Sequence, residues 1–339
     1  MDKKMFTESL LNWYDTNQRV LPWRENKDPY RVWISEIMLQ QTRVETVIPY
    51  FNRFINKIPT VEALSKVDDD ELNKLWEGLG YYSRARNLKF ASIQVMNEFN
   101  GIIPSTQKEL ESLKGIGPYT SGAVLSISFD KPFTAVDGNV LRVFSRLYAI
   151  DSNIKDPKTK KDIKGIVEEL LPKFRVGDFN QALMEIGATI CVPTGRPLCE
   201  KCPLASQCEA KKRNIQTILP IIEKRNSRRK QDVTYIILKA NDKYALRKRP
   251  PKGLLAGLYE FLNFDNKLSL NEVKAMYDFK SIEKLPSKKH IFTHIEWNIT
   301  AYLVELHEVI EPFIWASRDE LDTVYPIPVA FKKAFKKET

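Results

Sequence analysis

The chain has 339 residues and a formal net charge of +10 at pH 7. Because this length exceeds one usual domain, we expect two folding units, each with its own core. No segment approaches the roughly 18 apolar residues that a membrane span needs, and the cysteines are too few and too clustered for a secreted disulfide scaffold. The composition favours a soluble cytoplasmic protein, which we expect to be a monomer.

The excess positive charge lies in one short segment of the chain. Residues 211–230 contain eight Lys and Arg against one acidic residue, whereas residues 1–210 and 231–339 are each nearly neutral. A charge run of this kind is either a solvated linker or a stretch that lies along nucleic acid. We expect two domains, at 1–210 and 231–339, with a basic linker over 211–230 between them.

The N-terminal region is predicted to be helical. Residues 7–22 carry apolar side chains at helical spacing, with Thr7 as the expected N-cap. Asp28 followed by Pro29 is a capping residue before a proline at the first helical position. We therefore expect a second helix that begins there and continues to Thr42.

Glu36 stands in this second helix among apolar residues. Burial would disfavour its charged form and raise its pKa, as a proton-donating carboxyl group requires, but an amphipathic helix can also turn one glutamate toward solvent. Trp23 and Arg24 precede the helix. Both can line a pocket, or Trp23 can pack in the core with Arg24 beside it on the surface. Gln41 and Thr42 end the helix, where they can read base edges or form a plain polar terminus.

A glycine-rich loop, Gly78-Leu-Gly-Tyr-Tyr82, interrupts the helices predicted over residues 43–100. Leu79 and Tyr81 stand between its glycines, where burial is hard to arrange, so we expect both to be exposed. Either side chain can act as a wedge between stacked bases, as enzymes that flip nucleotides require. The alternative is that the loop covers an edge of the core.

A tight turn between two predicted helices contains Gly115 and Gly117. Two glycines around one apolar residue leave backbone N-H groups free to bind a phosphate oxygen at a helix N-terminus. Such a turn can also serve topology alone. Asp137 follows in the chain, just before another predicted helix, and it can cap that helix or act chemically.

The four cysteines are spaced Cys191-x7-Cys199-x2-Cys202-x5-Cys208. Four thiolates this close can hold a 4Fe-4S cluster or a zinc ion, and free thiols are the third interpretation. Structural zinc sites usually pair two short C-x2-4-C knuckles, whereas this window has only one. The spacing therefore favours the cluster.

The pattern changes after the basic segment. Residues 233–238 and 244–247 are predicted strands joined by a hairpin, and residues 295–303 alternate as a half-buried strand does. Together with short helices, these strands predict an α+β domain. The short helices are expected over 271–277, 318–321 and 328–335.

These features together resemble the helix-hairpin-helix DNA glycosylases, and most closely the MutY family of adenine DNA glycosylases. The resemblance rests on SEIMLQQTRVETV around Glu36, the glycine turn, Asp137 and the cysteine window, and it covers nearly the whole chain. It implies an all-α glycosylase domain with a 4Fe-4S cluster loop at 191–208, followed by a Nudix-like α+β domain. It also implies double-stranded DNA as partner, with adenine paired with 8-oxoguanine or guanine.

The resemblance assigns roles to particular residues. Glu36 would donate a proton to a ring nitrogen of adenine, and an ionised Asp137 would stabilise positive charge on the deoxyribose. Asn139 would orient these groups, and Tyr119 would support the sugar side. The remaining assignments are Trp23, Arg24 and Gln181 to the base pocket, Gln41, Thr42, Leu79, Tyr81, Gly115 and Gly117 to DNA, Phe292, Thr293 and His294 to the lesion, and Cys191, Cys199, Cys202 and Cys208 to the cluster.

Three positions differ from the family or its relatives. Tyr119 stands where bifunctional relatives such as endonuclease III carry a lysine that forms a Schiff base, so we predict base removal without an efficient lyase step. Thr293 stands where the family has serine, which keeps the hydroxyl group and adds a methyl group. The first cysteine spacing is seven residues where six are usual, and an outward bulge can absorb the extra residue.

Three other functions compete with this interpretation. Tyr119 argues against an endonuclease III-like lyase, and Glu36 and Asp137 argue against a redox-sensing module without catalysis. A Nudix hydrolase needs a glutamate-rich R-E-x-x-E-E helix to hold magnesium, and the sequence contains no such run. The sequence therefore favours a monofunctional DNA glycosylase of base excision repair.

Overall fold

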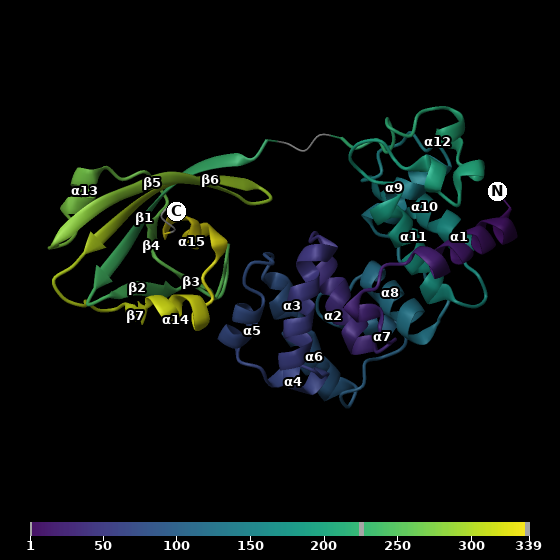
Figure 1. The fold of residues 1–339 in the computed structure, drawn as a ribbon. Helices are drawn as coiled ribbons and strands as arrows, with labels where there is room; N and C mark the ends of the chain where they lie inside the picture. The colour runs from purple at the N-terminus through teal and green to yellow at the C-terminus, as the bar shows by residue number, and fades with distance from the viewer. Residues whose placement is uncertain (1, 224–226, 336–339) are drawn as a thin grey trace. The chain divides into compact units, whose positions relative to one another are not determined.

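The computed structural model describes residues 2–223 and 227–335, and it divides the chain into two compact units (Figure 1). The first unit contains Met1–Lys66 and Asn87–Lys224, and the second contains Val67–Arg86 and Arg225–Thr339. An early segment of the chain thus belongs to the same unit as the C-terminal region. The domain boundaries expected from the sequence, at 210 and 231, stay a prediction.

The first unit is built of helices around an apolar core. Helices α1, α9, α10 and α11 share one cluster of buried side chains, in which Phe6 packs against Phe144 and Phe179. The helices with residues in this unit are α1 (Lys3–Asn17), α2 (Pro29–Leu39), α3 (Val44–Lys57), α4 (Val61–Lys66), α6 (Ser83–Glu98), α7 (Gln107–Ser112), α8 (Pro118–Phe129), α9 (Gly138–Leu147), α10 (Pro157–Leu170), α11 (Val176–Thr189) and α12 (Glu209–Lys212), with 3-10 turns at Pro22–Arg24, Cys199–Lys201 and Ala205–Gln207.

Helix α1 begins earlier than the sequence pattern indicated. Asp2 is its N-cap and accepts a hydrogen bond from the backbone N-H of Met5 at 3.0 Å. The prediction of a helix over 7–22 with Thr7 as N-cap is therefore wrong at both ends. The buried stripe of the helix already starts at Phe6, so the first turn must form before that residue.

Helix α2 begins where the sequence predicted. Asp28 accepts hydrogen bonds from two backbone N-H groups of the first turn, which is the expected N-cap geometry. The helix ends at Leu39 rather than Thr42. Gln41 has a φ of +58°, and this left-handed conformation cannot continue a right-handed helix.

Helix α8 is the centre on which the first unit is assembled. It is buried on almost every side from Thr120 to Ile127, and both α2 and α11 pack against it. A helix that is apolar all round belongs in a core. Side chains at its N-terminus are thereby held close to residues of α2 and α11.

The second unit contains a mixed seven-stranded sheet covered on both faces (Figure 1). The strand order is β3-β2-β1-β6-β5, with β1 and β6 parallel, while β4 pairs with β1 and β7 with β2. Helix α13 covers one apolar layer and α15 the other. The elements are α5 (Asp69–Leu75), β1 (Arg229–Ala240), β2 (Lys243–Lys248), β3 (Tyr259–Glu260), β4 (Leu262–Phe264), α13 (Leu270–Lys274), β5 (Ser281–Ile291), β6 (Ile295–Glu305), β7 (Ile314–Ser317), α14 (Arg318–Thr323) and α15 (Val329–Phe335).

The predicted strands and short helices of the C-terminal region are confirmed within a few residues at their ends. Across residues 2–223 and 227–335, no helix combines the length and the apolar character that crossing a membrane requires.

Candidate active site

Helices α2 and α8 bring Glu36 and Tyr119 together. The Glu36 side chain is buried, and the Tyr119 hydroxyl group donates a hydrogen bond to its Oε2 at 2.5 Å. Burial raises the pKa of Glu36 to about 7; the bond from Tyr119 opposes this rise, and the nearby Asp137 carboxylate adds to it. Of the two alternatives that the sequence left open, the side chain takes the buried one, and its raised pKa favours the neutral form more than in an ordinary glutamate.

Asp137 caps helix α9 and lies close enough to Glu36 to influence its pKa. Its carboxylate accepts hydrogen bonds from the backbone N-H of Val140 at 2.8 Å and from Nδ2 of Asn139 at 2.7 Å. Burial raises the pKa of Asp137, and these two bonds oppose that rise because they favour the ionised form. The Asp137 carboxylate is therefore both the N-cap of α9 and a neighbour of Glu36.

Arg142 holds Asn139 in place. Its Nη2 donates to Oδ1 of Asn139 at 2.9 Å and to the carbonyl oxygen of Gly187 at 2.7 Å, and its Nε donates to the carbonyl oxygen of Cys191 at 2.8 Å. A Cβ atom at Gly187 would lie 2.5 Å from Cβ of Asn139, so this approach requires glycine. Arg142 is not among the residues predicted for the site, although its position one helical turn after Asn139 was a usable signal.

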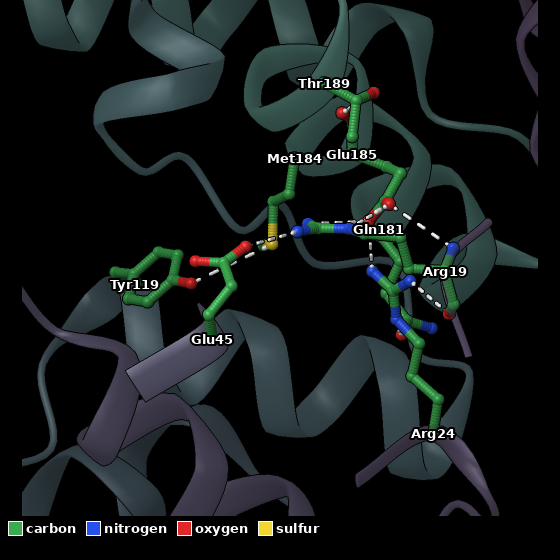
Figure 2. A network of polar contacts seen from close by, with 8 residues as sticks. All are labelled: Arg19, Arg24, Glu45, Tyr119, Gln181, Met184, Glu185 and Thr189. Atoms are coloured by element: carbon green, nitrogen blue, oxygen red, sulfur yellow. Dashed lines mark hydrogen bonds and ion pairs between the residues drawn. The ribbon is translucent and has the colours of Figure 1, made fainter. Parts of the chain in front are cut away.

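A second polar network surrounds the fully buried Glu185 of α11 (Figure 2). Its carboxylate pairs with Nε of Arg19 at 2.5 Å and with Nη2 of Arg24 at 2.8 Å. Burial alone would raise the pKa of Glu185, but the two guanidinium groups hold it below its ordinary value. Arg24 also donates from Nε to Oε1 of Gln181 at 3.1 Å, which leaves the amide NH2 group of Gln181 to face another acceptor.

This network explains how two of the predicted pocket residues are oriented. Arg24 is fixed by Glu185, and Gln181 is fixed in turn by Arg24. Figure 2 also shows Tyr119 pointing toward Met184, which lies on α11 with Gln181 and Glu185. The Tyr119 hydroxyl oxygen is 3.9 Å from Sδ of Met184. Glu185 is not among the residues predicted for the site, because a glutamate in a helix carries no sign of burial by itself.

The third predicted pocket residue, Trp23, is buried and packs against Phe51 in a T-shaped arrangement with the ring centroids 5.4 Å apart. The glycine turn has the backbone that the sequence indicated. Gly115 has a φ of +84°, and Gly117 is the N-cap of α8 without any side-chain cap.

Gln41 and Thr42 follow the end of α2. Gln41 is exposed, and Thr42 is half-buried beside it.

The glycine-rich loop of the second unit separates its two candidate wedge residues. Leu79 is only 6% exposed, so the expectation that it is exposed is wrong; the loop folds back far enough for Nε1 of Trp76 to donate to the carbonyl oxygen of Gly80 at 3.1 Å. Tyr81 is 43% exposed, as predicted. Its hydroxyl oxygen lies 2.9 Å from Oγ1 of Thr293.

Tyr81 and Thr293 line one cavity of about 570 Å³ within the second unit, and Phe292 and His294 also line it. Phe292 is half-buried and packs against Trp297 with ring centroids 4.8 Å apart. The His294 side chain is exposed. The structure thus brings the three residues of the predicted lesion signature to one hollow, together with Tyr81.

The four cysteines line a second, smaller cavity of about 30 Å³ in the first unit. Nη1 of Arg146 donates to Sγ of Cys191 at 3.2 Å, and burial raises the pKa of Cys202 to about 12. Among the residues that the structure describes, no three His, Cys, Asp or Glu side chains are placed to hold one metal ion. Four thiols that line one cavity form a donor set that either a 4Fe-4S cluster or a zinc ion can use.

Comparison with known families places this architecture in a class of repair protein. Residues 34–172 match the HhH-GPD superfamily of base excision DNA repair proteins, and residues 233–337 match the NUDIX domain. A thermostable thymine-DNA glycosylase structure superimposes with a TM-score of 0.57 at 31% identity, covering 62% of this chain and 97% of that chain. An endonuclease III-DNA complex, at 23% identity and a TM-score of 0.53, shares the fold. The chain is a helix-hairpin-helix protein of base excision repair with a Nudix-like domain.

Relatives found by sequence comparison identify the family within this class of repair protein. The adenine DNA glycosylase of Buchnera aphidicola subsp. Schizaphis graminum is 37% identical over 307 residues, covering 89% of this chain and 88% of the relative. The Homo sapiens adenine DNA glycosylase is 44% identical over 217 residues, covering 61% of this chain and 40% of the relative. The chain belongs to the adenine DNA glycosylase family. It is therefore a hydrolase acting on N-glycosidic bonds, and the predicted fold class and enzyme class are confirmed.

Proposed function

We propose that this enzyme removes adenine from DNA where adenine is paired with 8-oxoguanine or guanine, and that it does so by hydrolysis alone. The observation that carries the proposal is the buried pair of carboxyl groups. Glu36 has a pKa of about 7 beside Tyr119, and Asp137 accepts two hydrogen bonds that favour its ionised form. Two carboxyl groups held in opposite protonation states are what N-glycosidic hydrolysis needs.

In the proposed reaction, neutral Glu36 donates its proton to a ring nitrogen of adenine. The glycosidic bond breaks with its electron pair moving to the base, and adenine departs as a neutral molecule. Ionised Asp137 stabilises the positive charge that develops at C1′ of the deoxyribose. A water molecule then adds to C1′, and the proton it loses restores Glu36 to its acidic form.

Tyr119 limits the chemistry to this outcome. A phenol cannot form the Schiff base through which a lysine at this position would lead to strand cleavage. We assign Tyr119 a different role, which is to hold the Glu36 side chain in place and to support the sugar side of the nucleotide.

The base pocket and the DNA contacts are assigned from residues around this centre. Arg24 and Gln181 face the base, oriented by Glu185, and Trp23 supports them from the core. The backbone at Gly115 and Gly117 binds a DNA phosphate at the N-terminus of α8. We assign the opposite strand to Gln41 and Thr42, and the wedge between bases to Tyr81 alone, because Leu79 is buried.

The cavity of the second unit is assigned to inspection of 8-oxoguanine. Thr293 carries the hydroxyl group that meets the oxidised edge of the base, and Phe292 and His294 flank it. The distance of 2.9 Å between the hydroxyl oxygens of Tyr81 and Thr293 supports this assignment, since a wedge residue and a residue that recognises the lesion must act on the same base pair.

We assign Cys191, Cys199, Cys202 and Cys208 to a 4Fe-4S cluster with a structural role. A bound cluster supplies four iron-thiolate bonds that would brace this loop. Arg142 and Arg146, both on α9, bond to the loop at Cys191, so its shape is tied to the helix that Asp137 caps.

A glycosylase assay on three duplexes tests the proposed function. The duplexes carry adenine opposite 8-oxoguanine, guanine or thymine, and each reaction is scored for free adenine and for strand breaks with and without alkali. We expect adenine release from the first two duplexes, with breaks only after alkali. Failure to release adenine from any duplex contradicts the proposed substrate, and breaks without alkali contradict the hydrolytic mechanism.

A further inference from the structure

The segment Val67–Arg86 is far from the C-terminal region in sequence but shares a compact unit with it. This segment contains helix α5 and the loop that presents Tyr81. Tyr81 and Thr293 lie within hydrogen-bonding distance of each other although they are remote in the chain. Some part of the structure must therefore hold the segment in register with the sheet.

Lys74, on the last turn of α5, contacts the C-terminal region directly. Its Nζ donates to the carbonyl oxygens of Tyr325 at 3.0 Å and Leu321 at 3.3 Å, and to Oε2 of Glu77 at 2.7 Å. Leu321 belongs to α14 and Tyr325 follows that helix, so these carbonyl groups lie where the helix leaves its last acceptors unpaired. A cation at a helix C-terminus also interacts favourably with the helix dipole.

Glu77 extends this contact to a second helix. Its carboxylate pairs with Lys74 on one side and with Lys332 of α15 on the other. The first turn of α15 contains Val329 and Ala330, which line the same cavity as Tyr81 and Thr293. The Lys74 ammonium group is thus connected, through one carboxylate, to a wall of that cavity.

A separate contact holds the beginning of α5. Asp70 accepts hydrogen bonds from Nζ of Lys248 at 2.7 Å and from the Tyr259 hydroxyl group at 2.8 Å. The Lys248 and Asp70 side chains are partly exposed, whereas Lys74 and Glu77 are 19% and 14% exposed. Charge pairs that are shielded from water are screened less by solvent and salt than exposed ones.

We propose that Lys74 is a positioning residue for lesion discrimination, which holds the Tyr81 loop against Thr293 and the wall of the cavity. This inference rests on the proposed function, in which Tyr81 and Thr293 meet the mispair. Without the ammonium group, α5 loses its bonds to the carbonyl groups of Leu321 and Tyr325, Glu77 keeps only Lys332 of its two lysine partners, and the Tyr81 loop is free to move relative to Thr293. Recognition of 8-oxoguanine then weakens, while the chemistry at Glu36 and Asp137 is unchanged.

The test compares Lys74→Met with Lys74→Arg and with Lys66→Met. Methionine keeps an apolar stem of similar length without the three donors, arginine restores a cation, and Lys66 is an exposed lysine whose ion pair with Glu62 lies within α4. The rate of adenine release opposite 8-oxoguanine relative to guanine is expected to fall about tenfold in Lys74→Met, in keeping with the loss of charged hydrogen bonds. We expect Lys74→Arg to recover most of the ratio and Lys66→Met to leave it unchanged.

Hydrogen exchange on the same proteins provides a readout that does not depend on catalysis. Lys74→Met is expected to exchange faster both in residues 78–83 and in residues 290–295, with no change in α2. Faster exchange confined to residues 78–83, or an equal fall in release from both mispairs, overturns the inference. Should the wild-type protein release no adenine at all, the proposed function fails, and the exchange experiment still decides the positioning role.

Discussion

Glu36→Gln is expected to bind a duplex with adenine opposite 8-oxoguanine and to release adenine at least roughly 10²- to 10⁴-fold more slowly than the wild type. Glutamine has nearly the same shape and can accept the hydrogen bond from Tyr119, but it has no acidic proton to give to the base. The loss therefore falls on the chemical step. Single-turnover release of adenine and a binding titration on the same duplex measure the two quantities.

Glu62→Gln is the matched control for this variant. It makes the same chemical change at an exposed glutamate of α4, and we expect wild-type rates of release. Wild-type activity in Glu36→Gln would show that another group protonates adenine, and loss of both activity and DNA binding would show that the glutamine variant disrupts the site.

Asp137→Asn is expected to lower adenine release by roughly 10²- to 10³-fold, the range found when a group that stabilises developing charge is removed. Asparagine can still accept the N-H of Val140 through its amide oxygen, so α9 keeps its cap. The negative charge that faces the deoxyribose is lost. Binding to the mispair should persist because the phosphate contacts are untouched.

The matched control for this variant is Asp2→Asn, because Asp2 caps α1 by accepting an N-H from three residues along the chain, as Asp137 caps α9. It should release adenine at the wild-type rate. A thermal melt of both variants separates the two interpretations of Asp137. If Asp137→Asn lost stability and kept its rate, Asp137 would be only a helix cap.

Local sequence patterns predicted those parts of the fold and site that depend on neighbouring residues. The start of α2 at Asp28 and Pro29 follows from capping chemistry, whereas the apolar neighbours of Glu36 left its burial open and the family resemblance favoured it. The position of Asp137 before α9 follows in the same way. The predictions at Asp28 and Asp137 needed only residues within a few positions of the one concerned.

Features that depend on tertiary packing were not predictable in this way. The burial of Glu185 becomes understandable only once Arg19 and Arg24, far away in sequence, are placed beside it. The burial of Leu79 has a similar cause, since the loop around it is held by the Trp76 side chain. The position of the Val67–Arg86 segment within the C-terminal unit depends on contacts such as that of Lys74 with Tyr325.

The pH dependence of single-turnover adenine release tests the central claim most directly. Because burial raises the pKa of Glu36 to about 7 and the acid form is the active one, the rate should be high below that pH and fall about tenfold per unit above it. Burial also raises the pKa of Asp137, whose ionised form is required, so the rate should fall again toward acid pH and give a bell-shaped profile. A rate that rises with pH through neutrality would mean that Glu36 acts as a base, and it would contradict the account.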